Sequence, residues 1–251
     1  VRRIAVIGPL ARDKWDLFGS WCGHGDPETV TTFWDGIVKE FGGKAEIRYA
    51  EGCRRDGNDR SGFKAAADTA AWADVVVLCL GENMKWSGEN ASRSSISLPA
   101  IQEELAAEIA GCGKPLVIVL SNGRPLELNR LEPMANAILE AWQPGVKGGD
   151  AVAGILAGRI NPSGKLAITF PYSTGQIPIY YNRRKSGRHH QGFYQDITSE
   201  PLYPFGHGLS YTTYAYGDLT ASSTDFRRGD RIKVSVPVTN TGSVAGEETV
   251  M

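Results

Sequence analysis

Apolar residues in the first two thirds of the chain alternate between short continuous runs and runs with helical spacing. Between residues 30 and 41 they recur at i, i+3, i+4, i+7, i+8 and i+11, which is the spacing of one helix face. We expect this helix to begin at Asp26 and Pro27, a capping residue followed by a first-turn proline, and to end at Gly42. The alanine-rich residues 63–72 predict a second helix.

Continuous apolar runs predict the strands between these helices. Such strands lack alternating polar positions, so both faces of their sheet must be covered. The predicted strands are residues 4–7, 45–49, 75–80, 116–120, 137–141 and 166–170. Two further helices are expected, one between Pro99 and Gly111 and one that ends at Gly158. The alternation predicts an α/β fold with a mostly parallel sheet sandwiched by helices.

The pattern changes in the last third of the chain. Residues 172–214 lose periodicity and are rich in glycine, proline, tyrosine and arginine, which is typical of a functional or packing arm. Strict alternation at 232–238, followed by a turn sequence, then predicts antiparallel β structure. The expected domains are an α/β domain at 1–171, an irregular arm at 172–214 and the incomplete start of a β-sandwich at 215–251.

The composition excludes several kinds of partner. The 251 residues carry a formal net charge of −1, so we expect neither nucleic acid nor an anionic membrane as a partner. No apolar run approaches the roughly 20 residues that a membrane span needs. The four cysteines show no CxxC spacing and no metal pattern, and we expect no metal and no cofactor. Gly8 is followed by Pro9 and lacks the glycine pattern of a dinucleotide fingerprint.

Three loops leave the carboxyl ends of predicted strands, where open α/β sheets bind their ligands. They span residues 8–27, 81–97 and 121–125. The middle loop combines two carboxylates with aromatic and basic residues, namely Glu82, Trp86, Glu89 and Arg93. A carboxyl group that is partly desolvated by an aromatic neighbour can have its pKa raised into the working range of a general acid. The middle loop is therefore the candidate catalytic segment.

A structural role competes with the chemical one for each of these residues. Glu82 directly follows a strand, and we interpret it as a glutamate that accepts hydrogen bonds from loop amides. Arg93 has a simple role as the ion-pair partner of a loop carboxylate. Trp21, which lies among glycines in the first loop, suits both stacking on a sugar ring and packing under the loop. The residues alone leave Glu89 open between catalysis and an ordinary surface role.

Several stretches, in order along the chain, resemble glycoside hydrolase family 3. The first looks like the acid/base loop of that family, and the tail at 238–242 is similar to the start of its fibronectin type III-like domain. The matching stretches are Gly81-Glu82, Ser87-Gly88-Glu89, Ser92-Arg93, Ile96-Ser97-Leu98-Pro99, Gln102, Gly113-Lys114-Pro115, Ser121-Asn122-Gly123-Arg124-Pro125, Trp142-Gln143-Pro144-Gly145, 161–166 and 202–211.

The resemblance implies a retaining β-glycosidase. Its first expectation is a β-glucosidase that hydrolyses terminal nonreducing β-D-glucosyl residues of an oligosaccharide or other β-glucoside, and a β-xylosidase is the alternative within the family. Mapped by motif, Glu89 would be the general acid/base and Glu82 a structural glutamate of the site. Trp21 would form a wall of the positive subsite, and Trp86 and Arg93 would bind substrate or orient the loop.

The resemblance also implies a barrel domain that this sequence does not contain. That domain would carry the aspartate nucleophile, and retaining hydrolysis needs two carboxyl groups about 5–5.5 Å apart. The 251 residues alone are therefore expected to be inactive. The resemblance favours a periplasmic or secreted location and leaves a homodimer open.

A function of a different class also fits the residues. An α/β domain with aromatic side chains could hold carbohydrate without cleaving it, as a binding module. Trp21 would serve this function together with aromatic residues of the arm, namely Tyr180, Tyr181, Phe193 and Tyr194.

Overall fold

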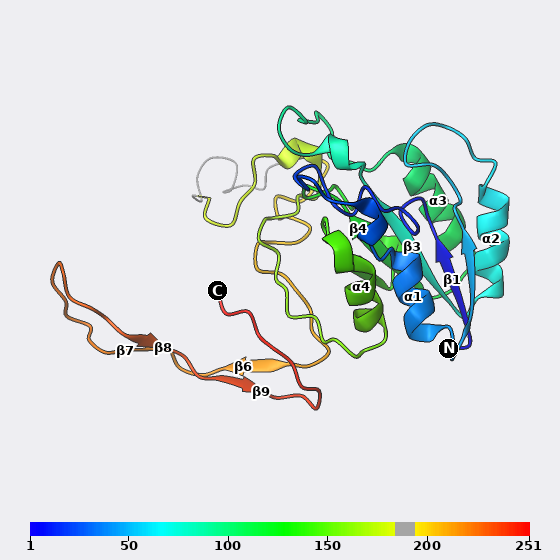
Figure 1. Ribbon diagram of the computed structural model, residues 1–251. Coiled ribbons are helices and arrows are strands. Elements are labelled where there is room, and N and C mark those ends of the chain that lie inside the picture. The colour runs from blue at the N-terminus through cyan, green and yellow to red at the C-terminus, as the bar shows by residue number, and fades with distance from the viewer. Residues whose placement is uncertain (184–193) are drawn as a thin grey trace.

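The computed structural model describes residues 1–183 and 194–251 (Figure 1). Phe193, which was expected to join the aromatic arm, lies outside the described residues. The α/β domain forms one body, and a long antiparallel ribbon near the C-terminus extends away from it (Figure 1). Among the described residues, none of the helices has the length and apolar character needed to cross a membrane.

One parallel sheet of five strands organises the α/β domain. Its strands follow the spatial order β2-β1-β3-β4-β5, and every neighbouring pair is parallel. The strands are β1 (Arg3–Ile7), β2 (Glu46–Ala50), β3 (Val75–Gly81), β4 (Leu116–Ser121) and β5 (Ala137–Glu140). The α/β fold with a parallel sheet, predicted from the alternating pattern, is confirmed.

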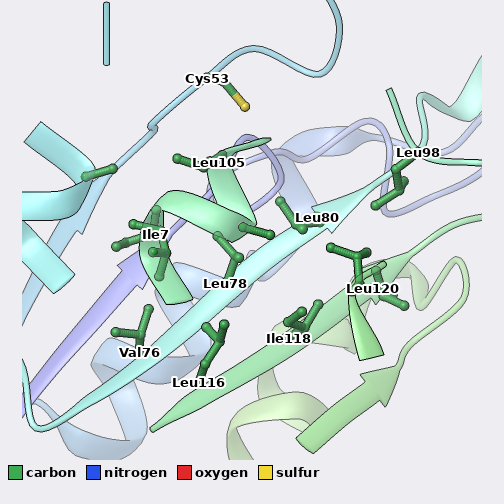
Figure 2. Close-up of a cluster of buried hydrophobic side chains, with 14 of the residues drawn as sticks. Ile7, Cys53, Val76, Leu78, Leu80, Leu98, Leu105, Leu116, Ile118 and Leu120 are labelled. Carbon is green, nitrogen blue, oxygen red and sulfur yellow. The ribbon is translucent and has the colours of Figure 1, made fainter. Parts of the chain in front are cut away.

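Helices cover both faces of the sheet, as the continuous apolar strands require (Figure 1). The helices are α1 (Phe33–Phe41), α2 (Phe63–Trp72), α3 (Ala100–Ala110) and α4 (Gly148–Leu156). Alternate residues of the central strand β3 point to opposite faces. Leu78 joins a buried cluster with Leu105 of α3 (Figure 2), whereas Val77 and Cys79 join a second cluster with Phe33 of α1.

The first helix begins later than its apolar spacing suggests. Asp26 is a genuine cap, but it caps a separate short 3₁₀ helix, Pro27–Thr29, after which Val30 is extended. The α-helix itself starts at Phe33, because the Thr32 hydroxyl accepts from the Asp35 N–H while the Asp35 carboxylate accepts from Thr32. The predicted start was therefore wrong, whereas the end at Gly42 is confirmed.

The strand predicted at 166–170 does not form. Only Phe170 makes a β-bridge, and its partner is Tyr203 of the arm. Leu166 likewise bonds to the arm, with its N–H 2.8 Å from the carbonyl oxygen of His207. This apolar segment packs under the arm instead of extending the sheet, and the Phe170 ring lies 5.7 Å from that of Trp142. Apolar character predicted the burial of Phe170 but not its partner, and Ile168 is 46% exposed although it is apolar.

The C-terminal segment is antiparallel, as the alternation predicts. β6 (Tyr214–Tyr216) pairs with β9 (Val238–Asn240), and β7 (Thr220–Ala221) pairs with β8 (Val234–Ser235). Pro237 separates β8 from β9, because a proline has no N–H to donate to a strand partner. Asn240 then forms the expected turn, with its side-chain oxygen accepting from the Gly242 N–H at 3.0 Å. The ribbon is largely exposed, including Val234 at 60%.

A carboxyl group with unusual titration lies where the last sheet strand ends. Glu140 closes β5, and its Oε1 accepts from the Trp142 N–H at 2.8 Å while its Oε2 accepts from the Asn122 amide at 3.3 Å. Burial, outweighing these two hydrogen bonds, raises the pKa of Glu140 to about 8. Glu140 is thus protonated in the folded protein at neutral pH, whereas the unfolded chain releases that proton near pH 4.5.

We predict that this group makes the fold less stable as the pH rises. The folded state retains a proton that the unfolded state loses, so stability falls between about pH 4.5 and pH 8. After allowance for partial solvent screening, the loss is on the order of 2 kcal/mol. Denaturant unfolding at pH 5 and pH 9 should show this fall in the wild type and a clearly smaller one in Glu140→Gln. The exposed Glu132→Gln should behave as the wild type, and equal falls in all three proteins would contradict the prediction.

Candidate active site

The candidate loop begins where β3 leaves the centre of the sheet. The Glu82 N–H donates to the carbonyl oxygen of Ser121 at 2.9 Å, so β3 and β4 stay paired up to the first residue of the loop. Met84–Trp86 then form a short 3₁₀ helix, started by the Asn83 side chain, which accepts from the Lys85 N–H. The loop therefore stands on the carboxyl edge of the two central strands, as its place in the sequence predicts.

Glu82 is the buried anchor of this loop. Its side chain is only 1% exposed and lies between two guanidinium groups. Arg93 Nη1 is 2.9 Å from Oε1, and Arg124 Nε is 3.1 Å from Oε2. The hydrogen bonds expected from loop amides are replaced by arginine partners, one from the same loop and one from the loop after β4. Two charge-assisted contacts offset the cost of burying the carboxylate.

Glu89 has the opposite surroundings. It is exposed, and its carboxylate makes no hydrogen bond or ion pair with any described residue. Asn90 and Gly88 on either side both have positive φ, 58° and 104°, so the chain turns sharply at this position. The two glutamates of the loop are therefore distinguished by their partners: Glu82 is paired with two arginines, and Glu89 is exposed and unpaired among the described residues.

Aromatic side chains lie beside this turn. Trp21 is 74% exposed, and a Cβ atom added to Gly88 would lie only 3.3 Å from its indole nitrogen. Trp86 is partly buried, and the guanidinium carbon of Arg93 lies 4.9 Å from its ring centroid. The structure thus brings Trp21 next to the Glu89 turn and directs Arg93 to Glu82 and Trp86. It places none of these groups on the Glu89 carboxylate.

A second acidic cluster, which the sequence reasoning missed, supports the start of the loop. Asp16 is buried in the loop after β1, and its Oδ1 accepts from the Met84 N–H at 2.9 Å. Arg55 forms ion pairs with both Asp13 and Asp16. Burial raises the pKa of Asp16, and the Met84 hydrogen bond acts against this effect. Nothing in the local sequence could reveal the cluster, because its members come from separate loops.

Gln102 joins the same support from helix α3. Its fully buried amide accepts from the Gly81 N–H at 2.9 Å and donates to the Gly81 carbonyl at 2.8 Å and the Arg55 carbonyl at 2.7 Å. In the sequence, Gln102 is the last residue of the loop motif. Its position explains why the motif extends into the helix: the side chain fixes the last residue of β3 to the loop that follows β2.

A cavity of about 550 Å³ opens beside Trp86. It is lined by residues that follow β1, β2 and β3, including Arg12, Asp13, Glu51, Arg55 and Asp56. The lining contains both basic and acidic side chains, so neither sign of charge dominates it. No cluster of histidine, cysteine and carboxylate side chains that could hold a metal occurs within 1–183 or 194–251.

Comparisons with known proteins agree with this architecture. A family model described as the glycosyl hydrolase family 3 C-terminal domain matches residues 1–211. The periplasmic β-glucosidase of Salmonella typhimurium is 40% identical, over 98% of this chain and 36% of its own length. A β-xylosidase of Formosa agariphila is 39% identical, over 100% of this chain and 35% of its own length.

Solved structures give the same result. The β-glucosidase from Listeria innocua, in complex with isofagomine, superposes with a TM-score of 0.87 at 35% identity, covering 98% of this chain and 35% of that one. The chain therefore spans about a third of the length of the relatives it matches. The family match, the identity with named glycosidases and the shared fold all agree: the chain belongs to glycosyl hydrolase family 3, of which it carries the C-terminal domain.

Proposed function

We propose that this chain is the part of a retaining β-glycosidase that supplies the general acid/base, Glu89. The observation that carries the proposal is the contrast between the two glutamates of one loop: Glu82 is buried between two arginines, and Glu89 is exposed beside Trp21. A proton donor must reach the substrate and must change its protonation state during the reaction. The exposure of Glu89 and its lack of ion-pair partners among the described residues support this role for it rather than for Glu82.

The proposed chemistry takes two steps and needs a second carboxylate from a barrel domain. In the first step that carboxylate attacks the anomeric carbon, the glycosidic C–O bond breaks, and Glu89 protonates the departing oxygen. In the second step Glu89 removes a proton from water, which attacks the anomeric carbon and releases the sugar from the nucleophile. Glu89 returns to its acid form, and the substrate anomeric configuration is retained.

Trp21 is proposed as the wall of the positive subsite, where the leaving-group sugar binds. Its indole is exposed and lies beside the Glu89 turn, so a pyranose ring stacked on it would sit close to the proton donor. Trp86 is proposed to line the other side of the loop, next to the polar cavity. Arg93 is proposed to act on this site indirectly, through Glu82 and Trp86.

The first substrate proposed is a β-glucoside, because named β-glucosidases recur among the relatives. A β-xylosidase is the second candidate, favoured by the 39% identity with the Formosa agariphila β-xylosidase over the whole chain. A periplasmic or secreted location is proposed from the name of the Salmonella typhimurium relative. The alternative function is carbohydrate binding without hydrolysis. A homodimer is proposed as an assembly, separately from the function.

Replacement of Glu89 by glutamine in the complete enzyme should remove the proton donor. General acid/base catalysis is worth typically 10²–10⁴-fold in rate, so hydrolysis of a β-linked disaccharide should fall by that order. Dinitrophenyl β-glucoside, whose leaving group needs little protonation, should still form the covalent intermediate, whose slow hydrolysis then limits turnover. Azide, which needs no general base, should restore turnover and yield a β-glycosyl azide, detectable by NMR.

Glu82→Gln is the matched control for this experiment. It leaves two buried guanidinium groups without their carboxylate, so the variant should lose stability and activity together. Azide should not restore its activity. If azide rescues Glu82→Gln but not Glu89→Gln, the two roles must be exchanged. If azide rescues neither variant although both remain folded, this loop does not carry the acid/base.

Trp21→Ala should separate binding at the positive subsite from the chemical step. Loss of the stacking surface should raise KM for a disaccharide about tenfold and leave its kcat nearly unchanged. For an aryl glycoside with a small leaving group, KM should change less. Trp15→Ala is a suitable control, because this tryptophan is also exposed, at 52%, and belongs to the same connection after β1. Equal effects of both substitutions on the disaccharide would speak against a subsite at Trp21.

A further inference from the structure

The turn that carries Glu89 is held at both ends by side chains from other loops. On one side, Ser87 is buried, and its Oγ accepts from Nε2 of Gln143 at 2.9 Å. On the other side, the carbonyl oxygen of Ala91 accepts from Nη2 of Arg124 at 3.1 Å. Between these two points, the Glu89 side chain has no partner among the described residues. Its position therefore depends on how its backbone is fixed.

Gln143 is closely enclosed where it meets Ser87. A Cβ atom added to Gly19, in the loop after β1, would collide with the Gln143 amide. A Cβ atom added to Gly123, in the loop after β4, would collide with Ser87 and come within 3.0 Å of Gln143 Nε2. A side chain at Gly19 or Gly123 would therefore collide with Gln143 or its partner Ser87. From its own position after β5, the Gln143 amide contacts the loops after β1, β3 and β4.

The backbone that presents Gln143 is itself strained. Trp142 has a φ of 52°, which is unusual for a bulky residue. Its carbonyl oxygen accepts from the Asn122 N–H at 3.1 Å and the Ser121 hydroxyl at 2.8 Å. Its N–H donates to Glu140. Three hydrogen bonds hold a conformation that costs energy, which is characteristic of segments with a positioning function.

Arg124 fixes the other end of the turn by two contacts of one side chain. Its Nε lies 3.1 Å from Glu82 Oε2, and its Nη2 donates to Ala91. The planar guanidinium group therefore connects the buried anchor at the start of the loop with the backbone just after Glu89. A lysine has one terminal nitrogen and lacks this fork of donors.

We infer that Gln143 and Arg124 are positioning residues that set the Glu89 carboxyl group relative to the Trp21 wall. Gln143 does so through Ser87, and Arg124 does so through Ala91 and Glu82. The inference rests on the proposed function of Glu89 and assigns no contact with substrate to either residue. Proton transfer to the leaving oxygen needs heavy-atom distances of about 2.6–3.2 Å, so a small displacement of this turn weakens catalysis.

The test uses the complete enzyme with Gln143→Ala and Arg124→Lys. Values of kcat/KM are measured for aryl β-glycosides whose leaving groups span a wide range of pKa, with the glycone that the wild type prefers. Misplacement of the acid should lower kcat/KM about tenfold or more for poor leaving groups and little for dinitrophenolate. The alkaline limb of the pH profile for a poor leaving group should also move, because it reports the acid form of Glu89.

Two further variants separate positioning from folding. The double variant Gln143→Ala, Ser87→Ala should have the same kcat/KM as Gln143→Ala alone, because both substitutions remove the same hydrogen bond. Arg130→Ala removes an exposed arginine that pairs with Glu103 on α3, away from the loop, and should leave all rates unchanged. Thermal unfolding of each variant establishes that the protein remains folded at the assay temperature.

Failure of the positioning role and failure of the acid/base role of Glu89 give different results. Suppose that azide rescues Glu89→Gln, but that Gln143→Ala and Arg124→Lys lower kcat/KM equally for all leaving groups or for none of them. The positioning role is then overturned, and Glu89 keeps its role. If azide does not rescue Glu89→Gln, the proposed acid/base itself is wrong. A steeper dependence on leaving-group pKa in both positioning variants supports the inference.

Discussion

The carboxyl edge of the sheet is arranged around one buried ion-pair cluster. In it, the Glu82 carboxylate lies between the guanidinium groups of Arg93 and Arg124. A buried charge must be paired and hydrogen-bonded, and this requirement brings the loops after β3 and β4 together. The second arginine also reaches the backbone at Ala91, so the same ion pair determines where the loop turns back. Glu89, at that turn, remains in solvent because the anchor lies elsewhere in the loop.

The parallel sheet makes this arrangement possible. Its carboxyl edge brings four loops together, and each contributes one kind of group: Asp16 from the loop after β1, Glu82 after β3, Arg124 after β4 and Gln143 after β5. Helices cover both faces of the sheet (Figure 1), and each pair of neighbouring strands has a fixed parallel register, so the four strand ends lie along one edge. Glycines at the contact points let the loops approach more closely than side chains would permit.

The proposed division of labour follows from this geometry. The loop after β3 presents one exposed carboxyl group, Glu89, beside the exposed Trp21, and the proposed nucleophile comes from another domain. A two-carboxylate reaction divided in this way needs accurate placement of the proton donor, because its partner is not on the same scaffold. The dense hydrogen bonding under an otherwise free Glu89 is consistent with that need, and it extends into the strained turn at Trp142.

The amino-acid pattern by itself determined the α/β class, the order of strands and helices and the loop that holds the candidate acid. These depend on local periodicity and on strand ends, which a sequence states directly. The sequence assigned Glu82 and Glu89 different roles, but only the tertiary structure decided which partners hold the loop, because Arg124 after β4 and Gln143 after β5 are far away in sequence. The same holds for residues 166–170: their apolar character predicted a sixth strand, but only Phe170 is both apolar and buried there, and its partner is Tyr203 of the arm. A preference for burial comes from a residue's own chemistry, whereas its actual burial and its partners depend on which distant segments the fold brings to it.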